Sequence, residues 1–336
     1  MRRYDTGSPL RWGILGCGQV TELKSGPAFN KVEGSRLVAV MRRDGAKAED
    51  YARRHGVPRW YDDADALIHD AEVDAVYIAT PPGSHCDYAL RVAAAGKVCC
   101  VEKPMALNAA QCRQMVEAFQ TAGKDLFVAY YRRSLPRFNQ VKQWLDQGAI
   151  GVPRHVHWSF SRAPSEQALA RAYEWRTDPA LSGGGLFVDL ASHGLDLMIH
   201  LLGPIEQACG VATNQQGLYA TEDAVSGALR FASGATGSGF WNFACHERQD
   251  QIVIQGSSGR IEFSVFDDQP LLLNSTEQSM SLRIAHPENI QFCHIENIVK
   301  HLNGELLHPS LGSDAMQASW VMDRMLASSV GNQVPG

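Results

Sequence analysis

The sequence predicts an α/β protein in two parts, a doubly wound parallel sheet followed by an α+β domain with a largely antiparallel open sheet. Over the first third of the chain, short apolar runs alternate with helical patterns, which is typical of βαβ units and a parallel sheet. A glycine-rich turn follows the first of these runs directly. In the second half, apolar runs with partial period-two character are separated by Gly-rich turns, which indicates antiparallel strands.

The elements of the first part are placed by their apolar runs and helical periodicity. The expected strands are residues 11–15, 36–40, 75–78, 98–101 and 126–129, and the expected helices include residues 46–55, 86–95 and 109–122. Pro27 falls in the helix after the first strand and is expected to kink or split it. We place the domain boundary near residue 130, which gives two domains of residues 1–130 and 131–336.

The second part contains the runs expected to form the antiparallel sheet. These strands are residues 154–160, 208–213, 224–231, 237–243, 251–255 and 260–265. Turns such as Ser257-Ser258-Gly259 separate them. Residues 291–330 follow a mostly helical pattern, so the domain is expected to carry a few helices beside its sheet.

The composition is that of an ordinary globular protein, with 45% hydrophobic residues, 20% charged residues and a net charge of −5. This charge argues against a nucleic-acid-binding surface. The eight cysteines include no CxxC pair, and Cys99, Cys100 and Cys209 sit in apolar runs, so we expect reduced, buried thiols in a cytoplasmic protein. A polar stretch follows Arg2-Arg3, so we expect no signal peptide, and no membrane-spanning segment is expected.

The glycine-rich turn reads Gly16-Cys17-Gly18-Gln19-Val20-Thr21. In a G-x-G-x-x-G pattern, the first Gly makes the tight turn and the second lets the backbone approach a pyrophosphate at the next helix N-terminus. We therefore expect a dinucleotide to contact Gly16, Gly18, Gln19 and Val20. Thr21 stands where a third Gly normally eases packing between helix and strand, so slightly looser packing is expected there.

The residues after the second strand bear on the choice between NAD and NADP, because an NAD site places Asp or Glu here and an NADP site tends to place Arg. The chain reads Arg42-Arg43-Asp44 at this point. A guanidinium can stack on adenine and bind a 2′-phosphate with two hydrogen bonds. Asp44 suits the N-cap of the next helix. The pattern therefore favours NADP, and NAD stays open if Asp44 binds the ribose.

A polar stripe crosses an apolar helical pattern after Gly183-Gly184-Gly185. Asp189, His193, Asp196 and His200 fall within one narrow wedge of a helix. One metal ion cannot contact both ends, since the stripe spans about 16 Å at 1.5 Å per residue, and we predict no metal site. Asp189 and His193, one turn apart, suit an oriented acid–base pair. We interpret Asp196 and His200 as buried polar groups with satisfied hydrogen bonds.

Four motifs together, GILGCGQV, ATPPGSH, VEKP and GGGLFVDLASH, resemble the glucose-fructose oxidoreductase and inositol dehydrogenase family, Gfo/Idh/MocA. The resemblance runs from Trp12 to about Met325. It implies a Rossmann domain followed by a mixed α/β domain that binds the substrate and forms a homo-oligomer. It also implies NAD(P)-dependent hydride transfer at a sugar, cyclitol or related hydroxyl carbon.

The resemblance also assigns roles by position in these motifs. The residues implied as catalytic are Lys103, Asp189 and His193, and those implied near the cofactor or the substrate are Thr80, Pro81, Pro82, His85, Arg132, Trp175 and Arg176. A cis Lys103–Pro104 bond is implied as well. Lys103 comes directly after a buried strand, where ligands bind in this architecture, and can contact both cofactor and substrate. Glu102 either contacts the nicotinamide ribose or holds Lys103.

The leading hypothesis is an NADP-dependent oxidoreductase that acts on a small, sugar-like carbonyl or alcohol. In it, His193 exchanges the substrate proton, Asp189 orients the imidazole and Lys103 stabilises negative charge on the substrate oxygen. One alternative is a glycoside hydrolase that holds NAD tightly for transient oxidation. Another is a non-catalytic sensor of the cofactor, although a sensor needs neither Lys103 nor His193.

Overall fold

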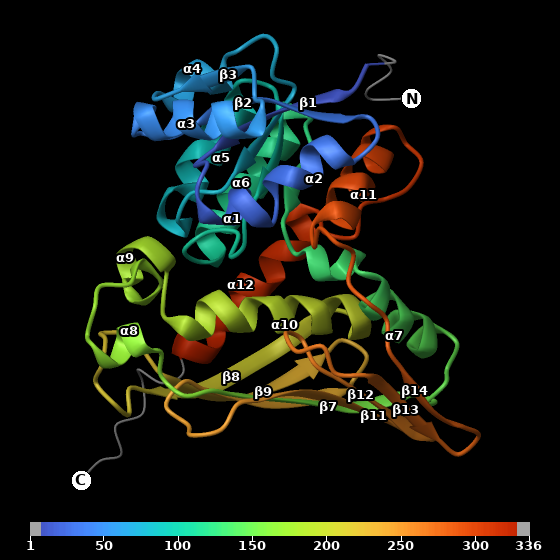
Figure 1. Ribbon diagram of the computed structural model, residues 1–336. Coiled ribbons are helices and arrows are strands. Elements are labelled where there is room, and N and C mark those ends of the chain that lie inside the picture. The colour runs from blue at the N-terminus through green and yellow to red at the C-terminus, as the bar shows by residue number, and fades with distance from the viewer. Residues whose placement is uncertain (1–7, 328–336) are drawn as a thin grey trace. The chain divides into compact units, whose positions relative to one another are not determined.

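The structure, a computed structural model, describes residues 8–327, which form two compact units (Figure 1). The first unit contains the chain up to Ala106, Ala110–Leu135 and His286–Met316. The second contains Leu107–Ala109, Pro136–Ala285 and the chain from Gln317 onward. The boundary that we predicted near residue 130 does not account for the return of His286–Met316 to the first unit. Arg2 and Arg3 lie outside the described residues.

The sheet of the first unit has six parallel strands in the order β3-β2-β1-β4-β5-β6. The strands are β1 (Leu10–Leu15), β2 (Ser35–Met41), β3 (Arg59–Tyr61), β4 (Ala75–Ile78), β5 (Val98–Val101) and β6 (Leu126–Val128). The strand order reverses between β1 and β4, which is where ligands bind in open α/β sheets. Five of these strands were predicted to within one residue at each end. β3 was missed because its three partly exposed residues form no apolar run.

Helices of the first unit pack against the strands of this sheet. They are α1 (Gln19–Leu23), α2 (Gly26–Lys31), α3 (Gly45–His55), α4 (Ala64–Ile68), η1 (Pro82–Ser84), α5 (His85–Ala94), α6 (Ala109–Ala122), η2 (Tyr131–Ser134) and α11 (Phe292–Leu302). Pro27 occupies the first turn of α2, so the helix after β1 is split as predicted. On one face, Trp12 and Phe29 share a buried core with Ile295 of α11, and Figure 1 shows α11 beside α2.

The sheet of the second unit has eight strands in the order β14-β13-β12-β11-β7-β10-β9-β8. The strands are β7 (Pro153–Ser161), β8 (Ile205–Thr213), β9 (Ala224–Phe231), β10 (Thr236–Asn242), β11 (Gln249–Gly256), β12 (Gly259–Phe263), β13 (Leu271–Ser275) and β14 (Ser279–Leu282). All neighbouring pairs are antiparallel except β7 and β10. The sequence predicted six of them and missed β13 and β14. β14 is mostly exposed, so no alternation of apolar residues marks it.

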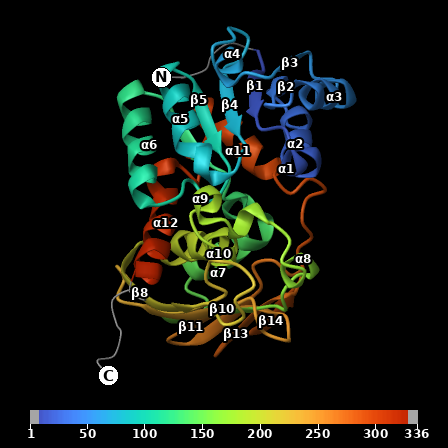
Figure 2. The same ribbon diagram turned by 90° about the vertical axis from the view of Figure 1, so that its left-hand side faces the viewer.

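Helices α7 and α10 lie on one face of this sheet (Figure 2). The helices assigned at least partly to this unit are α7 (Pro136–Asp146), α8 (Glu166–Leu169), η3 (Trp175–Thr177), α9 (Pro179–Ser182), α10 (Leu186–Leu202) and α12 (Gly312–Ala327). A Cβ atom at Gly194 would lie 2.3 Å from the ring of Trp158, so glycine lets α10 pack closely on β7. Pro179–Leu202 is long and apolar enough for a membrane span, but 72% of its most apolar window is buried, and core helices pass the same test.

All eight cysteines are free thiols. Cys99 and Cys100 are buried in β5, as predicted. The prediction for Cys209 is wrong, because this residue is exposed on β8, an edge strand. Its partner across the strand pair, Ala228, is exposed as well. An apolar run in the sequence therefore did not mark a buried strand here.

Candidate cofactor and substrate sites

The turn after β1 requires glycine at its first position. Gly16 has a φ of +89°, in the left-handed region that favours glycine. A Cβ atom there would lie 2.8 Å from Cγ2 of Thr80, in the turn after β4. Gly16 therefore lets the turns that follow two adjacent strands meet at the carboxyl edge of the sheet.

The second glycine of the turn leaves room for a ligand. A Cβ atom at Gly18 would meet nothing closer than the carbonyl oxygen of Gly16, at 3.8 Å. The backbone N–H groups of Gly18, Gln19 and Val20 donate to no acceptor within residues 8–327. Open space beside three unpaired donors fits the pyrophosphate of a dinucleotide, and these are the residues that would hold it.

Thr21 packs tightly, contrary to our prediction of looser packing. Its side chain is fully buried, and its hydroxyl donates to the carbonyl oxygen of Gly18 at 2.8 Å. The hydroxyl of Tyr51 on α3 donates to the carbonyl oxygen of Thr21 at 3.0 Å. A threonine thus replaces the third glycine by bonding to the turn itself, and the sequence pattern alone does not reveal this bond.

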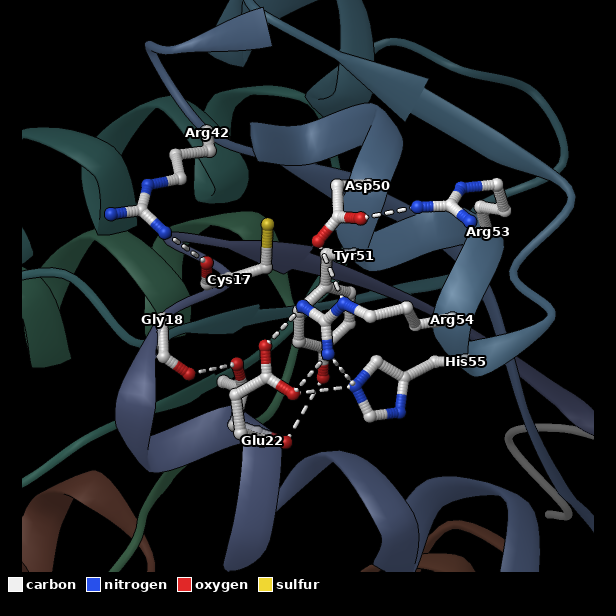
Figure 3. Close-up of polar contacts among 10 residues, drawn as sticks. Cys17, Gly18, Glu22, Arg42, Asp50, Tyr51, Arg53, Arg54 and His55 are labelled. Carbon is white, nitrogen blue, oxygen red and sulfur yellow. Dashed lines mark hydrogen bonds and ion pairs between the residues drawn. The ribbon is translucent and has the colours of Figure 1, made fainter. Parts of the chain in front are cut away.

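An ion-pair network joins α1 to the end of α3 (Figure 3). Glu22 accepts hydrogen bonds from Arg54 at 2.6 Å and lies 2.7 Å from Nε2 of His55. Arg54 also bonds to Asp50 at 2.7 Å. The hydrogen bond from Arg54 is the main reason that the pKa of Glu22 falls to about 2. The network fixes the helix that follows the glycine turn.

The residues after β2 place Arg42 at the glycine turn. Its Nη1 atom lies 3.4 Å from the carbonyl oxygen of Cys17 (Figure 3), while Arg43 is exposed. Asp44 is the N-cap of α3 and accepts from the N–H of Lys47 at 3.3 Å. Hydrogen bonding to Lys47, whose Nζ lies 3.0 Å away, lowers the pKa of Asp44. The role predicted for Asp44 as a helix cap is confirmed.

The turn after β4 carries Thr80, Pro81 and Pro82. The hydroxyl of Ser84 donates to Oγ1 of Thr80 at 2.7 Å. His85 is fully buried, with Nε2 at 2.7 Å from the carbonyl oxygen of Thr80 and Nδ1 at 3.1 Å from that of Pro104. Burial lowers its pKa. His85 therefore ties two turns together from inside, and its buried ring offers no surface along which a cofactor could lie, contrary to the expectation.

The carboxylate of Glu102 is held from three directions at the end of β5. It accepts hydrogen bonds from the hydroxyl of Tyr77, from Nε2 of Gln291 at 3.1 Å and from the backbone N–H of Lys103 at 3.1 Å. Burial, together with the charge of Glu102, raises the pKa of Tyr77. Glu102 thus fixes the backbone of Lys103, and the Lys103–Pro104 bond is cis. Sequence reasoning missed Gln291, which returns to this unit from a distant part of the chain.

Three further predicted residues lie on 3₁₀ helices. Arg132 on η2 is buried, with its guanidinium 5.0 Å from the ring centre of Tyr131. In the second unit, Trp175 and Arg176 lie on η3, and the guanidinium of Arg176 stacks 4.4 Å from the ring centre of Trp175. Arg132 therefore belongs to the first unit and the other two to the second.

The polar stripe lies on α10, as predicted. Asp189, in the first turn of the helix, pairs with Nε of Arg176 at 3.3 Å. His193 is 6% exposed and meets the ring of Phe266 edge-on, with ring centres 5.7 Å apart. Asp196 is fully buried. The structure therefore brings together Asp189 and Arg176, two predicted residues that the sequence did not connect.

Several residues that the sequence did not single out surround the N-terminal end of α10. Glu222 accepts from the N–H of Gly185 at 3.1 Å, and burial raises its pKa. Burial also raises the pKa of Tyr219 to about 12. Arg162 lies within electrostatic range of Asp189 and Glu174. Tyr219 and Glu222 lie in the loop between β8 and β9, whereas Arg162 follows β7, so no local spacing in the sequence could have connected them with α10. Among residues 8–327, no three His, Cys, Asp or Glu side chains are grouped as a metal site.

Both halves of the chain match models of one protein family. Residues 10–130 match the model described as an oxidoreductase family with an NAD-binding Rossmann fold, and residues 138–262 match the GFO/IDH/MocA C-terminal domain. Oxidoreductase P35 of Formosa agariphila is 39% identical over 317 residues, which cover 94% of this chain and 98% of that protein. The trans-1,2-dihydrobenzene-1,2-diol dehydrogenase of Mus musculus is 32% identical over 234 residues, which cover 68% and 67%.

A solved structure agrees with the fold of the whole chain. The aldose-aldose oxidoreductase from Caulobacter crescentus, complexed with glycerol, matches with a TM-score of 0.86 at 24% identity, covering 97% of this chain and 98% of that one. At this identity the match bears on the fold alone. The predicted combination of a parallel six-stranded sheet with a mostly antiparallel open sheet is confirmed.

Proposed function

Because the chain belongs to the Gfo/Idh/MocA family of NAD(P)-dependent oxidoreductases, we propose that it is an NADP-dependent enzyme for a sugar, cyclitol or related polyol. The observation that carries this proposal is the carboxyl edge of the first sheet. The unpaired amides after β1 and Lys103 after β5 both lie at this edge. The turn that carries a dinucleotide's phosphates is thus in the same unit as a lysine suited to polarise an oxygen.

The bound nicotinamide supplies or accepts the hydride. In the proposed division of labour, the Lys103 ammonium stabilises negative charge on the substrate oxygen, and His193 takes or returns the hydroxyl proton. Asp189, one helical turn before His193, is assigned to orient the imidazole, and its ion pair at 3.3 Å orients Arg176. Tyr77 and Gln291 act through Glu102 by fixing the backbone that carries Lys103.

The proposal is tested by a fluorescence screen of a panel of sugars, cyclitols and their keto forms. The screen follows the loss of NADPH or NADH with the keto forms and the formation of NADPH or NADH with the alcohols. Turnover of at least one polyol or ketone with net change of the cofactor is expected. No turnover across the panel would count against an oxidoreductase of this substrate class.

We also propose that the protein is a homo-oligomer located in the cytoplasm. The absence of disulfides among its eight cysteines is consistent with that location.

Cofactor preference is expected to depend on Arg42 and Arg43. The wild-type protein is predicted to bind NADPH more tightly than NADH by roughly 2–4 kcal/mol. Arg42 and Arg43 follow the second strand, after which this fold binds the ribose, and two guanidinium groups there would bind a 2′-phosphate. Changing both residues to Ala is expected to remove most of the difference in dissociation constants measured by titration. Arg53→Ala is the control, because the guanidinium of Arg53 donates to the carboxylate of Asp50 at 2.6 Å. This variant is expected to keep the wild-type preference. Equal affinities of the wild-type protein for the two cofactors would contradict the NADP preference.

The glycine turn is expected to tolerate no branched side chain at its second position. Gly18→Val would place methyl groups in the open space beside the unpaired amides, so cofactor binding is predicted to fall sharply. Because no protein atom lies close to this position, the thermal midpoint and the circular dichroism spectrum are expected to stay near those of the wild type. Unchanged cofactor affinity in a titration would mean that the dinucleotide lies elsewhere.

A further inference from the structure

Arg162 comes directly after β7 on the face of the sheet that α10 covers. Val156, Trp158 and Phe160 occupy every second position of β7, and Trp158 packs against Gly194 of α10, which identifies their face of the sheet. Arg162 continues this spacing of two. Its backbone N–H bonds to the carbonyl oxygen of Asn242, the last residue of β10, at 3.0 Å. The side chain therefore leaves the sheet on the same face as α10, which carries Asp189 and His193.

Three phenylalanines form a continuous floor between Arg162 and His193. We call Phe160, Phe243 and Phe266 the aromatic floor, in which Phe160 lies 5.9 Å from Phe243 and 5.3 Å from Phe266 between ring centres. The guanidinium of Arg162 lies over Phe243 at 5.6 Å, and His193 meets Phe266 at the other end. An apolar floor with a polar group at each end is a common arrangement in a ligand site.

Within residues 8–327, the guanidinium of Arg162 makes no hydrogen bond or ion pair, and its direct contact is with the ring of Phe243. Asp189 and Glu174 are the carboxylates whose negative charge acts on Arg162. Both form ion pairs with Arg176 instead, at 3.3 and 3.9 Å. Burial lowers the pKa of Arg162, although these carboxylates partly offset it. A partly buried cation without a direct partner is costly to keep unless a ligand supplies the partner.

We propose that Arg162 binds the carboxylate of the substrate, so that the substrate is a sugar acid rather than a neutral sugar, an inference that rests on the proposed oxidoreductase function. A planar guanidinium matches a carboxylate with two parallel hydrogen bonds. A sugar phosphate fits less well. It carries up to about two negative charges, and the acidic side chains of Asp189, Glu174 and Glu222 gather at this end of α10.

The test compares matched pairs of ligands that differ only in the acid group: D-glucose and D-glucuronate, D-galactose and D-galacturonate, D-mannose and D-mannuronate. Binding to the protein saturated with NADPH is measured by thermal shift and calorimetry at constant ionic strength. At least one uronate is expected to bind roughly 10- to 100-fold more tightly than its neutral partner. Arg162→Met is expected to remove this ratio, and Arg162→Lys to keep part of it.

Arg248→Met is the matched control. Arg248 also lies over the aromatic floor, 5.8 Å from the centre of Phe160, but its charge is paired with Asp267 at 3.0 Å. The ratio of acid to neutral affinity is expected to survive in this variant. The assignment is overturned if no uronate binds more tightly than its neutral partner, if glucose 6-phosphate binds more tightly than every uronate, or if Arg162→Met keeps the ratio.

The same proteins separate this inference from the proposed function. Turnover of neutral sugars without preference for any sugar acid would contradict the role proposed for Arg162 and would still support the oxidoreductase function. Binding of a uronate that depends on Arg162, with no turnover of any ligand, would support the carboxylate site and contradict the oxidoreductase function. Steady-state rates measured beside the binding constants distinguish the two results.

Discussion

Lys103→Met is expected to lower kcat by about 10²–10³-fold, the usual loss when a donor to a developing oxyanion is removed. Methionine keeps much of the length of the side chain and removes its charge. The backbone at this position is held by Glu102, which accepts the N–H of residue 103 whatever its side chain. The dissociation constant for NADPH is therefore expected to change little, and stopped-flow and titration measurements check both values.

Lys97→Met is the matched control for this substitution, because Lys97 lies just before the other end of the same strand. Its ammonium donates to the carbonyl oxygen of Asp70 at 2.6 Å, away from the carboxyl edge of the sheet. This variant is expected to keep kcat within about twofold while losing some stability, since it breaks one hydrogen bond worth roughly 1 kcal/mol. If both substitutions slow turnover equally, Lys103 has no specific role in the reaction.

His193→Ala is expected to lower kcat by about 10²–10⁴-fold, because it removes the group that moves the substrate proton. His200→Ala, two turns along the same helix, is the control and is expected to stay within a few-fold of the wild type. The pH profile adds an independent readout. The limb of the profile that belongs to the imidazole is expected to disappear in His193→Ala and to persist in His200→Ala.

Asp189→Asn is expected to slow turnover through the imidazole, so its effect should not multiply with that of His193→Ala. The double variant is predicted to be no slower than His193→Ala alone. Independent, multiplying effects would show that Asp189 acts on the substrate by another route, for which its ion pair with Arg176 is the obvious candidate.

The sequence predicted the elements that depend on local patterns. Val98–Val101 and Ala224–Phe231 were placed to the residue because buried or alternating apolar side chains mark their whole length. The strands that were missed are short or exposed. Arg59–Tyr61 has three residues, and Ser279–Leu282 is exposed over most of its length, so neither carries a hydrophobic signal.

The parts of the site that the sequence did not predict depend on contacts between segments that are distant along the chain. Gln291 reaches Glu102 across 189 positions of the chain. Thr21 departs from the glycine pattern in the sequence, and only the structure shows that its hydroxyl donates to the carbonyl oxygen of Gly18. Arg162 belongs to no motif, and the role proposed for it rests on its position over the aromatic floor and beside Asp189 and Glu174. Such contacts arise from tertiary packing and leave no local spacing in the sequence.

The most direct test of the proposed chemistry follows the hydride itself. NADPH deuterated at C4, on either face, is incubated with the best keto substrate of the panel, and the product is examined by mass spectrometry and NMR. Proposed hydride transfer predicts one deuterium on the carbinol carbon from one of the two labelled faces, with one NADP⁺ formed per product. A product without deuterium, formed with no net change in the cofactor, would contradict an oxidoreductase and favour hydrolysis through a tightly held nucleotide.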